Sequence, residues 1–246
     1  MIIALLLTII TGLFFIIGLI LNYYFKDKKD FINFSISLSF FIILGLIIFD
    51  LIPEVREYYL EYKGNDILLI SGFIISGILI LKIIDLFIPH HSHEEEIKNK
   101  THDNHLYHIG IVTSLAIILH NILEGILIYE VALKGIKEGI LISLGVALHN
   151  IPMGMQISSS LQAKKEKILV FSLLVISGLL GALIIIVLST NIKSYIMGPL
   201  MAITIGMLIY IVIFELLTEI VHNRKRIATI LGCITGIIIV ILSLIL

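Results

Sequence analysis

The chain has 246 residues, of which 59% are hydrophobic and only 14% are charged, and its formal net charge is −1. A soluble domain of this size needs far more polar surface, so the composition argues against a soluble protein and favours the lipid bilayer as the solvent. The single cysteine, Cys233, excludes an intrachain disulfide and a thiolate metal cluster.

Eight long apolar stretches follow one another along the chain. A transmembrane helix needs about 20 mainly apolar residues, and only helices or closed barrels satisfy backbone hydrogen bonds in lipid. The stretches lack the period-two alternation of barrel strands, so we predict one all-α domain, a polytopic membrane protein whose eight transmembrane helices form a single bundle over residues 1–246. The stretches are 2–24, 31–49, 67–88, 109–129, 139–161, 168–192, 194–214 and 227–246.

The lysines and arginines near the ends of these stretches indicate the orientation. If the N-terminus lies outside, the inner loops hold eleven of them and the outer loops hold five, while Lys82 sits near the inner end of the third helix. Cytoplasmic loops carry the excess of Lys and Arg, so both termini are predicted to lie outside. The inner residues are Lys26, Lys28, Lys29, Lys98, Lys100, Lys164, Lys165, Lys167, Arg224, Lys225 and Arg226, and the outer ones are Arg56, Lys63, Lys134, Lys137 and Lys193.

Residues 89–108, PHHSHEEEIKNKTHDNHLYH, form a long polar connection that holds six of the nine histidines. Because the segment lacks apolar periodicity, we predict a mobile, histidine-rich cytoplasmic loop. Its clustered histidines can form a weak metal trap, or they can belong to a solvated linker, and the sequence leaves both interpretations open. The histidines are His90, His91, His93, His102, His105 and His108.

Two copies of one polar pattern interrupt apolar stretches, LHNILEG at 119–125 and LHNIPMG at 148–154. His120 and Glu124 are four residues apart and share one helix face, as do His149 and Met153. A charged side chain at the bilayer centre costs roughly 2.5–3.5 kcal/mol on insertion scales. A favourable interaction must therefore offset the cost of placing Glu124 there. Two imidazoles, a carboxylate and a thioether suit a borderline divalent cation. The alternative is a set of hydrogen bonds that only holds the bundle together, but the repeated pattern favours the metal site.

The residues next to the histidines extend this candidate site. Pro152 removes a backbone donor, so the carbonyl group of Leu148 loses its helical partner and can help to coordinate an ion where it lines a cavity. Asn121 and Asn150 suit weaker ligands or interhelical hydrogen bonds, and Met153 is either a soft ligand or a space-filling core residue. The candidate metal ligands are His120, Asn121, Glu124, His149, Asn150 and Met153.

Through HNILEG at 120–125 and HNIPMG at 149–154 the chain resembles the Zrt/Irt-like (ZIP) family of divalent metal transporters. The resemblance extends to DLIPE at 50–54 and IYIVIFELLTE at 209–219, and it covers nearly the whole chain. It implies eight helices with both termini outside and a histidine-rich cytoplasmic loop between the third and fourth. It also implies His-Asn-x-Pro-Glu-Gly motifs in helices four and five.

The chain departs from the family pattern at three places. Leu123 stands where the motif proline is usual in helix four, and Met153 replaces the motif glutamate in helix five. In many family members an acid in helix six completes a second metal site, but here the matching stretch is SGLLGA at 177–182, with Gly181 near the acid's place. We therefore expect a single-metal centre. Its expected ligands are His120, Glu124 and His149, with Met153 and Asn121 or Asn150 as weaker partners.

The resemblance implies that the protein is not an enzyme but moves a divalent metal into the cytoplasm through a mid-membrane site between helices four and five. Imidazole with carboxylate favours zinc, and iron, manganese and cobalt compete for such ligands. The metal is then the transported substrate, and no separate cofactor is expected. The expected partners are the divalent metal and the bilayer of a cell membrane, and no nucleic acid is expected. Whether two copies of the chain form a homodimer stays open.

Two other functions fit some of the same residues. In a zinc-dependent intramembrane hydrolase, His120, Glu124 and His149 would hold zinc and activate water, but the core offers few candidates for a separate base. A metal sensor or structural membrane protein would bind metal without transporting it.

Four acids lie near the ends of helices two and seven, and they can either pass the ion along its path or simply be solvated. They are Asp50, Glu54, Glu215 and Glu219.

Overall fold

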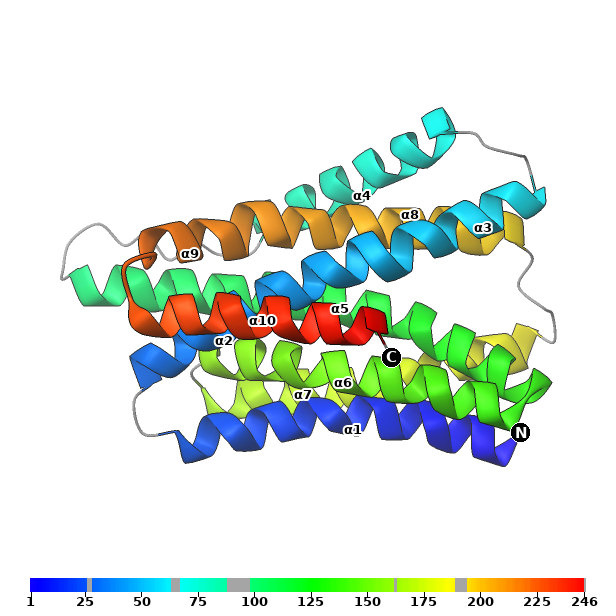
Figure 1. Ribbon diagram of the computed structural model, residues 1–246, viewed down its shortest axis with the longest axis horizontal. Helices are drawn as coiled ribbons and strands as arrows, with labels where there is room; N and C mark the ends of the chain where they lie inside the picture. The colour runs from blue at the N-terminus through cyan, green and yellow to red at the C-terminus, as the bar shows by residue number, and fades with distance from the viewer. Residues whose placement is uncertain (26–27, 63–66, 88–97, 162, 189–193, 246) are drawn as a thin grey trace.

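The computed structural model describes residues 1–25, 28–62, 67–87, 98–161, 163–188 and 194–245, and its regular elements there are all helices (Figure 1). Six helices run uninterrupted, and two long helices each contain one π-helical turn. The uninterrupted helices are α1 (Ile2–Tyr24), α4 (Ile67–Phe87), α5 (Lys98–Lys134), α6 (Ile136–Ser160), α7 (Lys164–Leu188) and α10 (Ile227–Ile245). The interrupted ones are α2 (Lys28–Gly45) with η1 (Leu46–Leu51) and α3 (Ile52–Tyr62), and α8 (Ser194–Tyr210) with η2 (Ile211–Leu216) and α9 (Leu217–His222).

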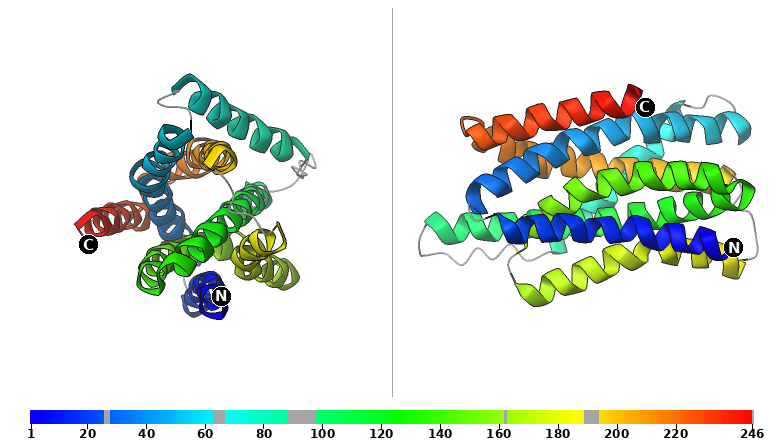
Figure 2. Two further views of the ribbon diagram at one scale, coloured as in Figure 1. Left: turned by 90° about the vertical axis from the view of Figure 1, so that its right-hand side faces the viewer. Right: turned by 60° about the horizontal axis from the view of Figure 1, so that its bottom comes forward.

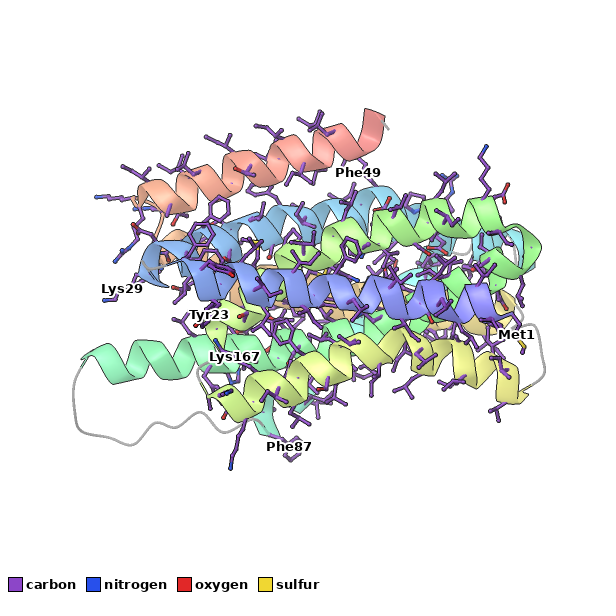
Figure 3. The ribbon with its side chains drawn as sticks, turned by 90° about the horizontal axis from the view of Figure 1, so that it is seen from below. Met1, Tyr23, Lys29, Phe49, Phe87 and Lys167 are labelled. Atoms are coloured by element: carbon purple, nitrogen blue, oxygen red, sulfur yellow. The ribbon has the colours of Figure 1, made fainter. Side chains whose placement is uncertain are left out.

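These eight helices correspond one to one to the eight predicted apolar stretches. Seven of them are long and apolar enough to cross a membrane, and the apolar part of the eighth, Ile227–Leu242, is shorter. The prediction of an all-α, polytopic membrane protein is therefore confirmed. Lys29 and Lys167 lie toward the end of the bundle at which Tyr23 is found, and Met1 lies at the opposite end (Figure 3). Which end faces the cytoplasm stays a prediction.

The helices pack as two groups, seen end-on in Figure 2. In the first group α1 and α5 pack on each other, and each packs on both α6 and α7. In the second group α2 packs on α10, and α8 packs on α3 and α4. The groups meet where α2 crosses α6 and where α5 passes α8 and η2. At the first crossing the hydroxyl group of Ser39 donates to the carbonyl oxygen of Pro152 at 2.7 Å. The sequence motifs of α5 and α6 therefore lie on the side of the first group that faces the second.

Both π-helical turns place an acid at this boundary between the groups. The amide of Ile52 donates to the carbonyl of Ile47, and that of Leu217 donates to the carbonyl of Val212, five residues back in each case. Pro53 follows the first turn, at the second residue of α3, and has no amide hydrogen to donate to a helical partner. π-Turns of this kind are frequent at functional sites, and these two contain Asp50 and Glu215.

The structure differs from the expected loop at residues 89–108. Helix α5 begins at Lys98, so residues 98–108 are helical rather than a loop, and His108 is buried with 4% of its surface exposed. The polar sequence misled the prediction because a helix that leaves the bilayer no longer needs an apolar face. His90, His91 and His93 lie outside the described residues, as do the side chains of His102 and His105.

Glycines bring α5 and α7 into backbone contact. A Cβ atom added at Gly125 would lie 2.0 Å from the carbonyl oxygen of Gly178, and one at Gly181 would lie 2.0 Å from that of Ile122. Such small residues allow close helix packing in membranes. Gly72 on α4, by contrast, has nothing within 4 Å of its added Cβ.

We expect Gly125→Ala to destabilise the fold and Gly72→Ala to leave it unchanged or slightly more stable. Alanine is favoured over glycine in a helix by about 1 kcal/mol, and only at Gly125 does the new methyl group meet backbone atoms that must move apart. The measurement is the fraction of detergent-purified protein that stays monodisperse after heating. Equal heat resistance of the two variants would contradict the close contact of α5 and α7.

Candidate metal centre

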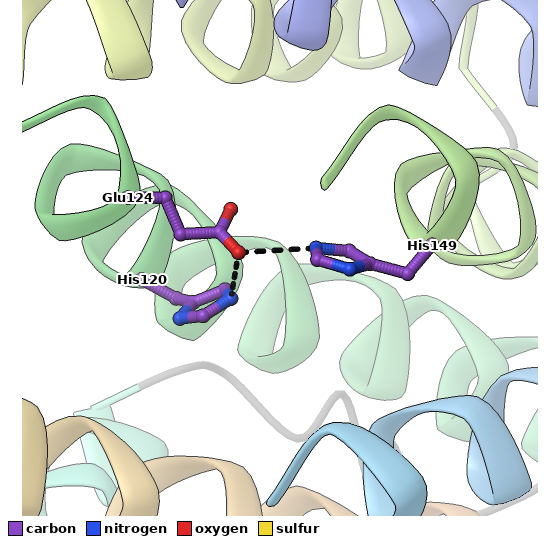
Figure 4. Close-up of side chains that lie close together, drawn as sticks. All are labelled: His120, Glu124 and His149. Atoms are coloured by element: carbon purple, nitrogen blue, oxygen red, sulfur yellow. Dashed lines mark ion pairs between the residues drawn. The ribbon is translucent and has the colours of Figure 1, made fainter. Parts of the chain in front are cut away.

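Three side chains from α5 and α6 converge on one point inside the bundle (Figure 4). The Nε2 atom of His120 lies 3.0 Å from Oε1 of Glu124, one turn further along α5, and the Nε2 atom of His149 on α6 lies 3.1 Å from the same oxygen. His120 has 1% of its surface exposed, and the side chains of Glu124 and His149 have 11% and 14% exposed. One carboxylate oxygen is therefore shared between two imidazoles in a largely buried setting.

This geometry is close to what a divalent metal requires. One ligand atom from each of the three residues lies within 4.8 Å of the other two, and tetrahedral zinc with bonds of about 2.0–2.1 Å separates its ligands by about 3.3 Å. Apart from their contacts with Oε1, the Nε2 atoms of both histidines lack hydrogen-bond partners in the described part of the chain, and so does Oε2 of Glu124. Buried polar atoms normally have partners, so an ion bound among them would satisfy all three.

A cavity of about 760 Å³ opens onto the three side chains. Its walls come from both helix groups, and three acids of η1 and α3, Asp50, Glu54 and Glu57, line it together with His120 and Glu124. For four acids the sequence left open whether they pass the ion on or are solvated, and two of them, Asp50 and Glu54, line this cavity. Glu57 was missed, although the spacing of positions 50, 54 and 57 puts the three on one helix face.

The remaining candidate ligands, Asn121, Asn150 and Met153, do not line the cavity. The side-chain amide of Asn150 donates to the carbonyl oxygen of Thr11 on α1 at 3.1 Å, and Asn121 is buried with its Oδ1 lacking a hydrogen-bond partner among the described residues. Met153 is fully buried in the main hydrophobic core. Leu148, whose carbonyl group Pro152 was predicted to free, lines the cavity.

The other two acids, on η2 and α9, are buried instead of solvated. Glu215 has 5% of its surface exposed and Glu219 has 3%. The carboxylate of Glu219 accepts a hydrogen bond of 2.6 Å from the side-chain amide of Asn223. Glu215 approaches Asp85 and His108 in a second group of potential metal ligands. Sequence reasoning did not link these last three residues.

The chain therefore has the fold of a polytopic helical membrane protein. Its candidate metal centre is a largely buried carboxylate shared by two imidazoles at the wall of an acidic cavity. Comparison with known proteins places the chain among transporters. Residues 89–244 match the family model described as "ZIP Zinc transporter", and the chain belongs to this family.

Similar proteins include three that are named zinc transporter ZupT. The one from Clostridium perfringens is 30% identical and aligns over 99% of this chain and 95% of its own. Those from Chlorobium luteolum and Streptococcus mutans are 32% and 28% identical, each aligned over 99% of this chain and 97% of its own. The protein is thus a multi-pass transporter of the cell membrane and not an enzyme, which sets the hydrolase alternative aside.

Proposed function

We propose that the protein carries zinc, in competition with iron, manganese and cobalt, across the cell membrane into the cytoplasm. The ion passes through the mid-membrane centre of His120, Glu124 and His149. The observation that carries this proposal is the convergence of both imidazoles, from two helices, on one carboxylate oxygen. The names of the three relatives support zinc as the preferred ion.

The chemistry of the cavity supports a path as well as a binding point. Asp50, Glu54 and Glu57 offer oxygen ligands on the wall opposite α5 and α6, and oxygen ligands bind partly hydrated divalent ions. An ion can therefore exchange water for carboxylate oxygens before it reaches the histidines. Because neutral imidazoles and an ionised carboxylate are the binding forms, protons compete with the metal at this centre.

The direction of transport rests on the distribution of basic residues. The predicted inner loops carry eleven lysines and arginines against five in the outer loops, and such an excess marks the cytoplasmic side. The histidine-rich segment then lies in the cytoplasm, where its clustered imidazoles would collect or regulate metal near the end of the path.

The proposal is tested by zinc uptake into sealed vesicles that contain the purified protein. We expect saturable uptake that Fe²⁺, Mn²⁺ and Co²⁺ inhibit and that Mg²⁺ and Ca²⁺ inhibit far less, because imidazole ligands disfavour hard cations. Zinc bound by the protein without uptake above that of empty vesicles would instead identify a sensor or a structural metal protein.

Asn121, Asn150 and Met153 are proposed as weaker partners of the centre, and Met153 allows a clean test. Met153→Leu keeps the side-chain volume close to that of methionine but removes the soft sulfur ligand. We expect a lower affinity for zinc at unchanged thermal stability, measured by titration of the purified protein. Met155→Leu makes the same chemical change in a separate core cluster and is the control. Equal affinities of the two variants would assign Met153 to packing alone.

A further inference from the structure

Two buried polar side chains lie on the side of the metal centre that faces away from the cavity. The cavity wall extends from His120 toward the end of α5 and from His149 toward the start of α6, and among the described residues none on the other side of these histidines belongs to it. Thr113 precedes His120 by seven residues and Gln156 follows His149 by seven, which is about 10 Å along each helix at 1.5 Å per residue. Because seven residues make nearly two full turns, each of these side chains shares the helix face of its histidine.

The packing of α5 against α6 brings these two side chains to the same level of the bundle. The helices are antiparallel: His149 lies beside Glu124, and nearer the start of α5 a Cβ atom added at Gly110 would lie 3.0 Å from the Cβ atom of Ser160. The two side chains fall between these contacts, three residues after Gly110 and four before Ser160. Helix α6 ends a few residues before Lys167, which lies at the end of the bundle predicted to face the cytoplasm (Figure 3).

Each of the two side chains has an oxygen atom that no described residue satisfies. Thr113 and Gln156 both have 0% of their surface exposed, and neither Oγ1 of Thr113 nor Oε1 of Gln156 has a hydrogen-bond partner in the described part of the chain. A helix hydroxyl group can donate to a carbonyl of the preceding turn, as that of Ser114 does to the carbonyl oxygen of Ile111 at 2.9 Å. The hydroxyl of Thr113 makes no such bond. Leaving a buried polar atom unpaired is costly, so both oxygens are available to a ligand.

One layer of apolar side chains separates these oxygens from the metal centre. Ala116 and Ile117 on α5 and Met153 on α6 occupy the turn between them, and each has 0% of its surface exposed. An ion that leaves His120 and His149 toward the predicted cytoplasmic end must cross this layer. The first polar atoms that it then meets on these faces of the two helices are the two unpaired oxygens.

We propose that Thr113 and Gln156 bind the ion transiently on its way from the centre to the cytoplasm, an inference that rests on the transport function proposed above. Hydroxyl and amide oxygens are neutral ligands, and they suit a partly hydrated divalent cation. A site on a conduction path must attract the ion enough for entry and hold it weakly enough for release. The two residues therefore speed the release of the ion and contribute little to its binding at the centre.

The test compares Thr113→Val and Gln156→Leu by maximal zinc flux into vesicles, by zinc affinity of the purified protein and by heat resistance in detergent. We expect each variant to lose at least about fivefold in maximal flux, the factor that one contact of hydrogen-bond strength contributes, at unchanged zinc affinity. Valine keeps the shape of threonine and removes an unpaired buried hydroxyl, so Thr113→Val should resist heat at least as well as the unmodified protein.

Two further variants serve as controls. Thr8→Val makes the same change at a residue with 0% exposure whose hydroxyl already donates to the carbonyl oxygen of Leu5 at 2.8 Å, and it should leave flux unchanged. Thr113→Ser keeps the hydroxyl group and should retain most of the flux that Thr113→Val loses.

The outcomes separate this inference from the proposed function. Flux equal to that of Thr8→Val in both Thr113→Val and Gln156→Leu would overturn the inference and leave the centre untouched. Flux that falls together with heat resistance in Thr113→Val would assign that residue to packing, and flux that falls in step with zinc affinity would assign both residues to the centre; either result overturns the inference. Normal flux in Glu124→Gln would contradict the centre itself, whatever these variants show.

Discussion

Glu124→Gln should leave the protein folded in the membrane and lower zinc flux by at least about 100-fold, since even residues behind a metal's direct ligands contribute 10–100-fold to metal affinity. The carboxylate is the only acidic ligand in direct contact with His120 and His149 in the described structure. An amide of equal size keeps the packing but carries no charge to neutralise a divalent ion, and its NH₂ group would repel the ion.

The measurement is zinc uptake into vesicles that contain equal amounts of each variant. Glu138→Gln is the control, because it removes one carboxylate from the exposed first turn of α6. Flux near the unmodified level in Glu124→Gln, with normal insertion, would rule out this carboxylate as a direct ligand.

His149→Ala and His120→Ala should each weaken zinc binding at the mid-membrane centre by at least about tenfold and lower flux with it. Each substitution removes one of the two imidazoles that contact Oε1 of Glu124 and that we propose as the nitrogen ligands of the ion. The loss should be specific to metals that prefer imidazole, such as zinc.

Binding is read by zinc titration of the purified variants. His222→Ala, at the exposed end of α9, is the control for loss of a histidine. Zinc affinities that match those of the control would place the ion elsewhere in the cavity, for example at Asp50 and Glu54.

The sequence was sufficient to predict the helices and the approach of His120, Glu124 and His149 on α5 and α6. Apolar stretches of membrane-crossing length have no alternative to helices in lipid, and His120 and Glu124 share a face because four residues make about one turn. Hydropathy marks where a helix leaves the bilayer rather than where it ends, which is why the starts and ends of α3, α5 and α9 differ from the predicted stretches.

The grouping of Asp85, His108 and Glu215 could not be predicted because these three residues are far apart in the chain. Only the packing of α4 and η2 around α5 brings Asp85, His108 and Glu215 together. Each looked ordinary by itself: Asp85 is near a helix end, His108 falls in a histidine-rich polar segment, and Glu215 is near the end of an apolar stretch. Glu215 is turned inward within a π-turn, and periodicity calculated for a regular α-helix does not anticipate that turn.

The most direct test of the mid-membrane centre is an anomalous-scattering map, recorded at the zinc absorption edge, of crystals of the purified protein grown with zinc. The proposal predicts a peak between α5 and α6 that lies about 2.0–2.2 Å from Nε2 of His120, Nε2 of His149 and a carboxylate oxygen of Glu124. A map without a peak at that position, from protein that transports zinc in vesicles, would contradict the proposed path of the ion.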